Sequence, residues 1–203
     1  MLFVFGALLN AFGMVSPVYA LENWIAKILG VNRELPVLGF IFGLFLVLEP
    51  LLLIGIAAWL TRVWGGSRKP IVAVAVRYSY VLAPLGFGIW LAHYGFHFLT
   101  GIYTVVPVTQ SAFAEFGWAV LGQPRWGAPG LAPNVVQVVE FGFVLLGLVG
   151  SLLVGWSIAT TEKADHPSRV FALWALVALI VAAAALWLMS QPMEMRAVTL
   201  GVG

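Results

Sequence analysis

The sequence of 203 residues contains no cysteine. The chain therefore cannot form a disulfide or a thiolate metal site, and it cannot ligate an iron–sulfur cluster with its own residues. Charge is also scarce, because Asp, Glu, Lys and Arg together make up 9% of the chain. The basic residues stand at the ends of apolar segments and form no stripe that could follow phosphates, so nucleic acid is not an expected partner.

Hydrophobic residues make up 62% of the chain, which leaves too little polar surface to cover a globule in water. The composition indicates an all-α, multi-pass membrane protein, because a helix satisfies its own backbone groups in lipid. A helix needs about 20 mostly apolar residues to cross a bilayer. We therefore predict one integral membrane domain over residues 1–203, a polytopic transmembrane helix bundle of about five spans: 1–20, 36–61, 71–105, 135–159 and 169–190.

The first of these segments has a small-residue end, Val18-Tyr19-Ala20, that is typical of a signal-peptide cleavage site. A signal peptide carries a basic residue before its apolar run, and none is present here. We therefore expect residues 1–20 to stay as the first span. The next segment, "LENWIAKILGVNRELP", is amphipathic and predicts a helix along the membrane interface. A long outer loop rich in proline, glycine and tryptophan is expected between the third and fourth spans.

Lysine and arginine in the short loops indicate how the chain is oriented. With the N-terminus inside, the outer side holds Lys27, Arg33, Arg125 and Arg196. The remaining basic residues then face the cytoplasm: Arg62, Arg68, Lys69, Arg77, Lys163 and Arg169. We therefore predict an N-terminus inside, in the cell inner (cytoplasmic) membrane or another energy-transducing membrane. The basic cluster between spans two and three, Arg62, Arg68, Lys69 and Arg77, is expected to meet a cytoplasmic partner or anionic lipid.

Four ionisable side chains lie inside the predicted spans, where such groups are costly and usually functional: Glu49, His93, His97 and Glu140. Measured from Arg77, the helical rise places His93 at about 24 Å and His97 at about 30 Å along the third span. The fourth span enters from that far side, and Glu140 lies about 10 Å inside it. These three residues are therefore predicted to share one level, whereas Glu49 lies near the midplane.

The two histidines stand four residues apart, so they lie on one helix face, one turn above the other. His93 and His97 can converge on one metal ion or one proton relay, but they cannot be opposite axial ligands of a single haem. The third histidine, His166, is in the turn at the other membrane face. We therefore predict a cofactor site formed by His93, His97 and Glu140, with metal ligation by the histidines. Haem b or quinone at a subunit interface is the candidate cofactor.

Structural roles for the same residues stay open at this point. The histidines can bond helix carbonyls or join Tyr94 and Tyr103 in an interfacial aromatic belt, and Glu140 can stabilise a helix N-terminus. The chain is then a non-redox structural anchor. A small proton- or ion-conducting transporter subunit would use Glu49, His93 and Glu140 as polar stations, although few intramembrane polar groups are available for a path. No nucleophile–base pair or metal triad indicates an enzyme with a soluble substrate.

Four phrases carry a resemblance to a known family: "GALLNAFGMVSPVYALENW", "RYSYVLAPLGFGIWLAHYGFHFLTG", "VPVTQSAFAEFG" and "GLVGSLLVGWSIA". They resemble the C-terminal membrane region of polyferredoxin-like 4Fe-4S membrane proteins of the NosR, NapH and FesM type. The resemblance implies a membrane subunit of a respiratory or photosynthetic-type electron-transfer complex that works between quinol or ferredoxin pools and other redox partners. In that family, cluster-binding cysteines precede this region. Their absence here implies that a separate iron–sulfur or cytochrome subunit is the partner, and "HYGFH" carries over as a positioned motif.

Overall fold

The computed structural model describes residues 2–31, 33–127, 129–162 and 164–192. Within these ranges the chain is helical and has no strand, which confirms the predicted all-α transmembrane bundle. Four continuous helical stretches of the described chain are long and apolar enough to cross a membrane: Glu34–Val63, Ile71–Glu115, Pro133–Thr161 and Pro167–Met189. Two residues of the charge count, Lys163 and Arg196, lie outside the described residues.

The predicted span over residues 1–20 is divided between two helices. Helix α1, Leu2–Phe12, has 11 residues, which is about 16 Å at helical rise and roughly half of a hydrocarbon core. A turn follows, and α2, Ser16–Leu29, begins with a proline in its first turn. Because a proline at a helix start has no N–H to leave unsatisfied, Pro17 favours a new helix here over continuation of α1.

Helix α2 ends at Gly30, which has a left-handed φ of 63° that glycine adopts without strain. The helix is amphipathic as expected, but only part of its apolar side is buried. Ile25 is buried, whereas Trp24 and Ile28 are exposed. The inward face instead includes Tyr19 and Glu22.

The second long stretch consists of α3 (Glu34–Gly43), a π-helical segment η1 (Leu44–Leu48) and α4 (Glu49–Val63). The third consists of α5 (Ile71–Ser79), the 3-10 turn η2 (Tyr80–Leu82), α6 (Ala83–Gly101), the 3-10 turn η3 (Ile102–Thr104) and α7 (Val105–Glu115). Helix therefore continues past the predicted end at residue 105, and the outer loop is shorter than expected. After a 3-10 turn η4 (Ala119–Leu121), α8 (Pro133–Thr161) and α9 (Pro167–Met189) complete the fold.

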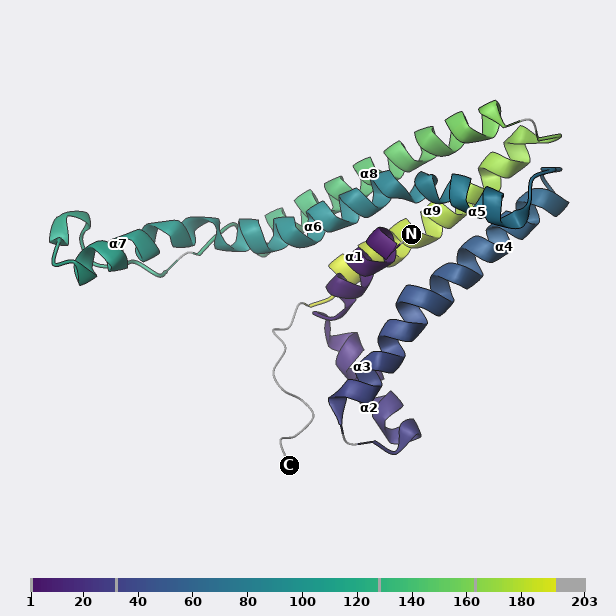
Figure 1. Cartoon of the computed structure of the whole chain (residues 1–203). Helices are drawn as coiled ribbons and strands as arrows, with labels where there is room; N and C mark the ends of the chain where they lie inside the picture. Colours follow the sequence, from purple (N-terminus) through teal and green to yellow (C-terminus); the bar gives the residue numbers. More distant parts are fainter. Residues whose placement is uncertain (1, 32, 128, 163, 193–203) are drawn as a thin grey trace.

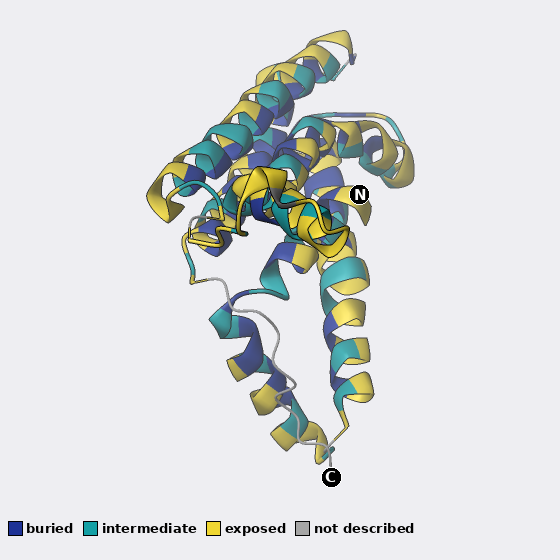
Figure 2. Ribbon diagram, turned by 90° about the vertical axis from the view of Figure 1, so that its left-hand side faces the viewer, coloured by how far each residue is buried: buried dark blue, intermediate teal, exposed yellow. Residues whose placement is uncertain are grey.

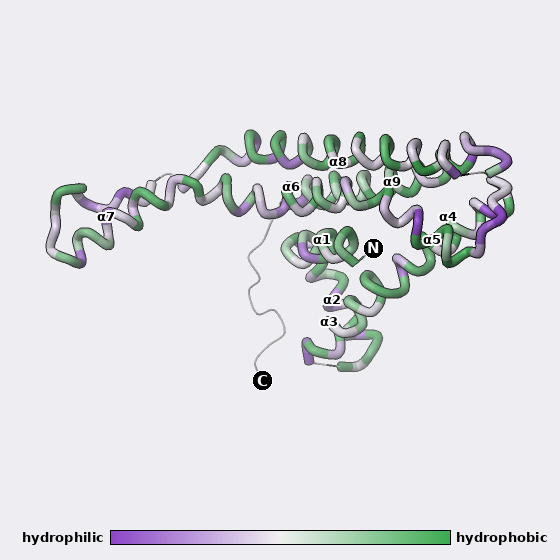
Figure 3. Tube along the Cα trace, turned by 45° about the horizontal axis from the view of Figure 1, so that its top comes forward, coloured by the Kyte–Doolittle hydropathy of each residue, from purple (hydrophilic) through white to green (hydrophobic). Residues whose placement is uncertain are grey.

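Helices α6 and α8 run side by side, and α9 folds back along α8 (Figures 1 and 3). Helix α1 packs on α6, and the lower half of α4, with α2 and α3, leans away from the α6–α8 pair (Figure 1). Helix α7 projects beyond the other helices at the far end of α6 (Figure 1). The fold therefore has one dense region, where α4, α5, α8 and α9 meet, and two arms that extend from it.

The α6–α8 pair is held by small residues that bring the two backbones together. A side-chain carbon on Gly147 would lie 2.8 Å from the Pro84 carbonyl oxygen and 3.0 Å from Leu85 Cα. One on Gly88 would meet the Phe143 carbonyl oxygen. Without a hydrophobic driving force inside lipid, such close van der Waals contact is what holds helices together.

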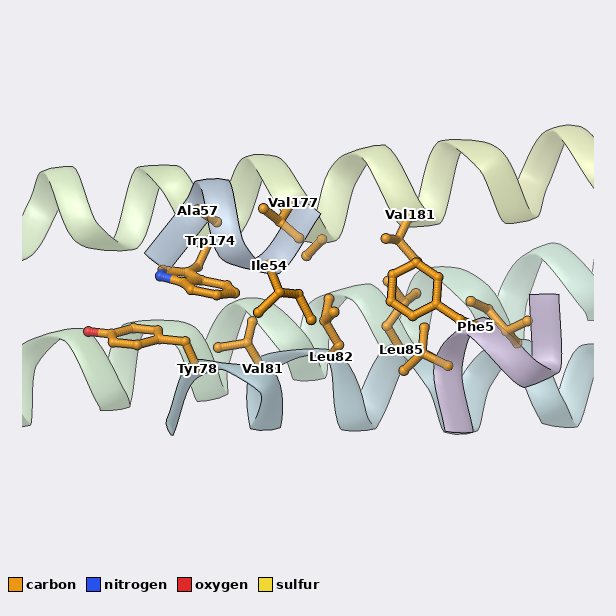
Figure 4. Packing of buried hydrophobic residues seen from close by; sticks show 14 of the residues in the cluster. Phe5, Ile54, Ala57, Tyr78, Val81, Leu82, Leu85, Trp174, Val177 and Val181 are labelled. Carbon is orange, nitrogen blue, oxygen red and sulfur yellow. The ribbon is translucent and has the colours of Figure 1, made fainter. Parts of the chain in front are cut away.

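The dense region is centred on Trp174 of α9, which is fully buried. Its ring stacks on Tyr78 of α5, with centroids 5.0 Å apart and planes 13° apart (Figure 4). Its indole Nε1 donates a 3.0 Å hydrogen bond to Thr61 Oγ1, and Thr61 in turn donates to the Ala57 carbonyl of α4 at 2.8 Å. Because the indole N–H is satisfied, this large ring can be buried without the penalty of an unpaired donor.

Most helices carry a broad exposed face (Figure 2), and much of that face is apolar. The exposed side chains include Leu35, Val138, Leu146 and Leu153, which are 82%, 72%, 70% and 66% exposed. Such faces are costly in water but are solvated by lipid tails or covered by neighbouring subunits in a membrane. The surface therefore agrees with a multi-pass membrane protein.

Candidate functional site

The register of α6 against α8 is fixed at two places. Near one end, Gly88 packs against Gly147 and the Phe143 carbonyl. Near the other, the Leu131 amide donates a 2.9 Å hydrogen bond to the Leu99 carbonyl oxygen. The two chain segments run antiparallel, so residues midway between these contacts on α6 lie at the level of residues midway between them on α8.

His93 and Glu140 occupy these midway positions, and both side chains are buried at 3% exposure. The predicted common level of these two residues therefore agrees with the register. The His93 Nδ1 atom and the Glu140 Oε1 atom are inaccessible, and neither has a hydrogen-bond partner among the described residues. A buried polar atom without a partner costs on the order of 1–3 kcal/mol. Two such atoms at one level mark a place where the described chain leaves polar groups unmatched.

His97 has different surroundings from His93. Its ring packs edge-on against the His93 ring, with centroids 5.0 Å apart and planes at 84°, yet the residue is exposed. It borders a shallow hollow that also includes Phe98, Gly101 and Val108. The predicted common helix face is thus divided, with one imidazole in the α6–α8 seam and the other open to the surroundings of the chain.

The geometry limits which cofactors these residues can hold. Among the described residues, no three histidine or carboxylate side chains gather closely enough to hold a metal ion. A flat ring also cannot lie between α6 and α8 at Gly88, because the backbones are already in contact there. A haem or a quinone would therefore approach from outside, where His97 is accessible, and would draw its other ligands or contacts from elsewhere. Metal ligation by His93 and His97 stays a prediction.

Two structural alternatives fail to account for the unmatched atoms. The Nδ1 of His93 bonds no helix carbonyl. Glu140 does not lie at a helix end either, since α8 begins at Pro133 and has no acidic residue in its first turn. Stabilisation by the helix dipole falls off within that turn. Neither carbonyl capping nor the dipole therefore explains why these two side chains are buried.

A second polar centre, which the sequence did not reveal, surrounds Glu162 at the other end of α8. This carboxylate is 4% exposed. Ser67 Oγ donates a 2.8 Å hydrogen bond to its Oε1, and Lys69 Nζ lies 3.8 Å from the same oxygen. Arg77 Nε lies 3.7 Å from Oε2. Glu162 therefore binds the connection between α4 and α5 to the end of α8.

This arrangement changes the interpretation of the basic cluster. In sequence, the cluster has no acid beside it, but the fold brings Glu162 to Lys69 and Arg77, and Asp165 to within 3.9 Å of Arg68. The hydrophilic segments of the two turns meet at this end (Figure 3). A backbone hydrogen bond of 3.1 Å from His166 to the Gly65 carbonyl joins them. The two basic turns thus lie on one side, as their assignment to one membrane face requires.

Comparison with known proteins identifies no relative. No family model matches the chain, and neither a curated protein nor a solved structure matches it. The resemblance to polyferredoxin-like membrane proteins therefore stays a prediction, and the function has to be argued from the site itself.

Proposed function

We propose that the chain is a membrane subunit of an electron-transfer complex in an energy-transducing membrane, with its N-terminus inside. A separate iron–sulfur or cytochrome subunit is the redox partner, and the level of His93, His97 and Glu140 forms this chain's side of a haem or quinone site. The observation that carries the proposal is the pair of buried, unpartnered atoms, His93 Nδ1 and Glu140 Oε1, beside an accessible imidazole.

The chemistry of these groups suits both cofactors. An imidazole and a carboxyl group can hydrogen-bond the oxygens of a quinone, and a single imidazole can ligate one side of a haem iron. His97 is accessible for either task, while His93 and Glu140 are buried along α6 and α8. A haem would take its second axial ligand from the partner, because the two imidazoles lie on one side of the site.

The outer faces of α4 and α8 support the presence of a partner. Large apolar side chains such as Ile56, Leu146 and Leu153 are exposed on them. At the basic end, Arg62 is exposed and enters no ion pair within the described chain, so it remains available to a cytoplasmic partner or an anionic lipid.

The test begins with the complex purified from its own membrane in mild detergent. We expect a haem absorption band or extractable quinone in the wild-type complex, and its loss by a factor of at least about ten in His97→Ala, since a single ligand bond is removed. His93→Ala should lower occupancy to a smaller extent. The matched control is His166→Ala, an exposed histidine in the opposite turn, which should retain the full cofactor content.

A complex that contains no haem or quinone, or that keeps its full content and turnover in both variants, would exclude this site. If assembly also remained normal, the chain would be a structural anchor. Proton-coupled flux through liposomes that contain this chain alone would instead favour the transporter alternative.

A further inference from the structure

A separate cavity of about 260 Å³ lies between α1, the η1–α4 segment and α9. Four aromatic residues contribute to its lining: Phe5, Phe12, Phe45 and Trp187. The remaining lining is aliphatic except for Glu49, which is the one ionisable residue among the described residues around it. This combination of an apolar cavity and one polar group is typical of sites that bind small molecules.

Glu49 lies at the centre of its membrane-spanning stretch. The stretch Glu34–Val63 has 30 residues, and Glu49 stands about 22 Å from one end and about 21 Å from the other at 1.5 Å per residue. The residue is exposed, and its carboxyl group makes no hydrogen bond or ion pair with any described residue. A carboxyl group at this depth is costly unless it is neutral or has a partner.

The backbone around Glu49 is irregular on both sides. The π-helical segment η1 ends at Leu48, directly before it, and Pro50 follows it. The extra residue in a π turn rotates the helix face that follows, and such turns occur often at functional sites. Pro50 has no N–H to donate to the carbonyl one turn earlier. The regular pattern of backbone hydrogen bonds is therefore interrupted around Glu49, whose carboxyl group lines the cavity.

We propose that this cavity binds a lipid-soluble molecule with a flat, carbonyl-bearing head group of the quinone class, which enters from the bilayer. A neutral carboxylic acid can donate a hydrogen bond to a carbonyl oxygen and accept one from a hydroxyl group. Aromatic side chains around it provide surfaces on which a flat ring can stack. An alkylammonium amphiphile would need an ionised Glu49 and further acceptors, and the lining offers no second ionisable group for it.

The site does not depend on the proposed function, because binding here requires neither an electron-transfer partner nor the histidines. The experiment uses the full chain in lipid nanodiscs. An azido-quinone probe labels the protein in the light, a short-chain benzoquinone competes with it, and mass spectrometry locates the labelled peptides. We expect labelled residues on α1 and α9. The extent of labelling should fall to a plateau as the competitor concentration rises, which gives an apparent affinity.

Two variants change the cavity and one serves as the control. Glu49→Leu should weaken binding about tenfold, because the hydrogen bond to the carbonyl oxygen is lost. Leu8→Trp should abolish labelling by filling the cavity, whose wall includes Leu8. Glu115→Leu removes an exposed carboxyl group on α7, outside the cavity, and should leave labelling unchanged. Thermal unfolding of each variant confirms that it is folded before labelling is compared.

Wild-type labelling in both Glu49→Leu and Leu8→Trp would overturn the proposal and would mean that acyl chains fill the cavity. Displacement of the probe by a long-chain amine, but not by the benzoquinone, would overturn the assigned ligand class. His93→Ala should be labelled on α1 and α9 as the wild type is. Loss of binding in that variant alone would place the quinone at the histidines and would remove this site.

Discussion

Two buried carboxylates belong to the region of helix α8, Glu140 about two turns into the helix and Glu162 directly after its last residue, and they differ in what surrounds them. Glu140 and Glu162 are 3% and 4% exposed. Glu162 has a hydrogen bond from Ser67 and ion pairs with Lys69 and Arg77. One oxygen of each carboxylate, Glu162 Oε2 and Glu140 Oε1, is inaccessible and has no hydrogen-bond partner among the described residues. Glu162 Oε2 lies 3.7 Å from Arg77 Nε, whereas Glu140 has no cation beside it in the described chain. Burial alone therefore does not distinguish these two carboxylates, whereas their partners do.

The difference follows from the elements that meet at each end. At Glu162, the α4–α5 connection supplies a hydroxyl group and cations from an element far away in the sequence. At Glu140, the packing comes from α6, whose facing residues are mostly apolar or glycine. The carboxylate of Glu162 thus has polar and charged partners within the described chain, and that of Glu140 has none there.

The largest expected effect comes from disrupting the close packing of α6 against α8 near Glu140. In Gly88→Ala, the new methyl group would collide with the Phe143 backbone, which cannot move as a side chain can. We expect a loss of about 3 kcal/mol or more in the free energy of unfolding, measured by denaturant titration in micelles. Gly142→Ala is the control, because nothing lies within 4 Å of the added carbon. Equal stability of the two variants would contradict the packing described.

A smaller effect is expected at Glu162, which has polar and charged partners. Glu162→Gln removes the charge from Lys69 and Arg77, whose side chains are 43% and 42% exposed and can turn to water. The amide keeps an acceptor for Ser67, so we expect a loss of about 2 kcal/mol, below the usual cost of breaking a fully buried pair. Thermal unfolding at low and high salt measures it. A variant as stable as the wild type would show that this cluster does not stabilise the fold.

The hydrogen bond next to this cluster should contribute less. Trp174→Phe keeps an aromatic ring to pack on Tyr78 but removes the Nε1 donor to Thr61. We expect the lost hydrogen bond to lower the free energy of unfolding by about 1 kcal/mol. The smaller ring adds a packing loss to this value. Trp156→Phe, at an exposed position, is the control. A Trp174→Phe variant that is no less stable than this control would contradict the role of the hydrogen bond.

The smallest effect is expected at the exposed ion pair of the same end. Arg68 and Asp165 are 88% and 58% exposed at their side chains and lie 3.9 Å apart. Asp165→Asn should therefore change stability by less than about 0.5 kcal/mol, and the change should disappear in high salt. Thermal unfolding in two salt concentrations measures it. A cost as large as that of Glu162→Gln would mean that exposure does not weaken this pair.

Hydropathy and length predicted the fold class and four of the spans, because membrane thickness fixes how long an apolar helix must be. They did not predict the division of residues 1–20, since the turn before Pro17 is itself apolar and the hydropathy stays high across it. Hydropathy and length also predicted an end of the third span at residue 105, whereas the helical stretch continues to Glu115. Polar residues such as Thr109 and Gln110 reduced the apolar signal there without interrupting the helix.

The candidate site was predictable where it depended on helical rise alone. Counting residues along two antiparallel spans placed His93 and Glu140 at one level, and this needs only a regular helix. Glu162 was missed because its hydrogen-bond partner Ser67 lies 95 residues away, and no local pattern links the two turns. The available signal was a glutamate directly after a long apolar span, on the membrane face that carries the basic cluster.

The central claim is that Glu140 lacks a partner among the described residues whereas Glu162 has several. It is tested most directly by the unfolding of the isolated chain in micelles, with Glu140→Leu and Glu162→Leu measured side by side. We predict that Glu140→Leu leaves stability unchanged or raises it by about 1 kcal/mol, because an unpaired buried polar group is removed. Glu162→Leu should lower stability by about 2 kcal/mol or more. Equal losses in both variants would contradict the account.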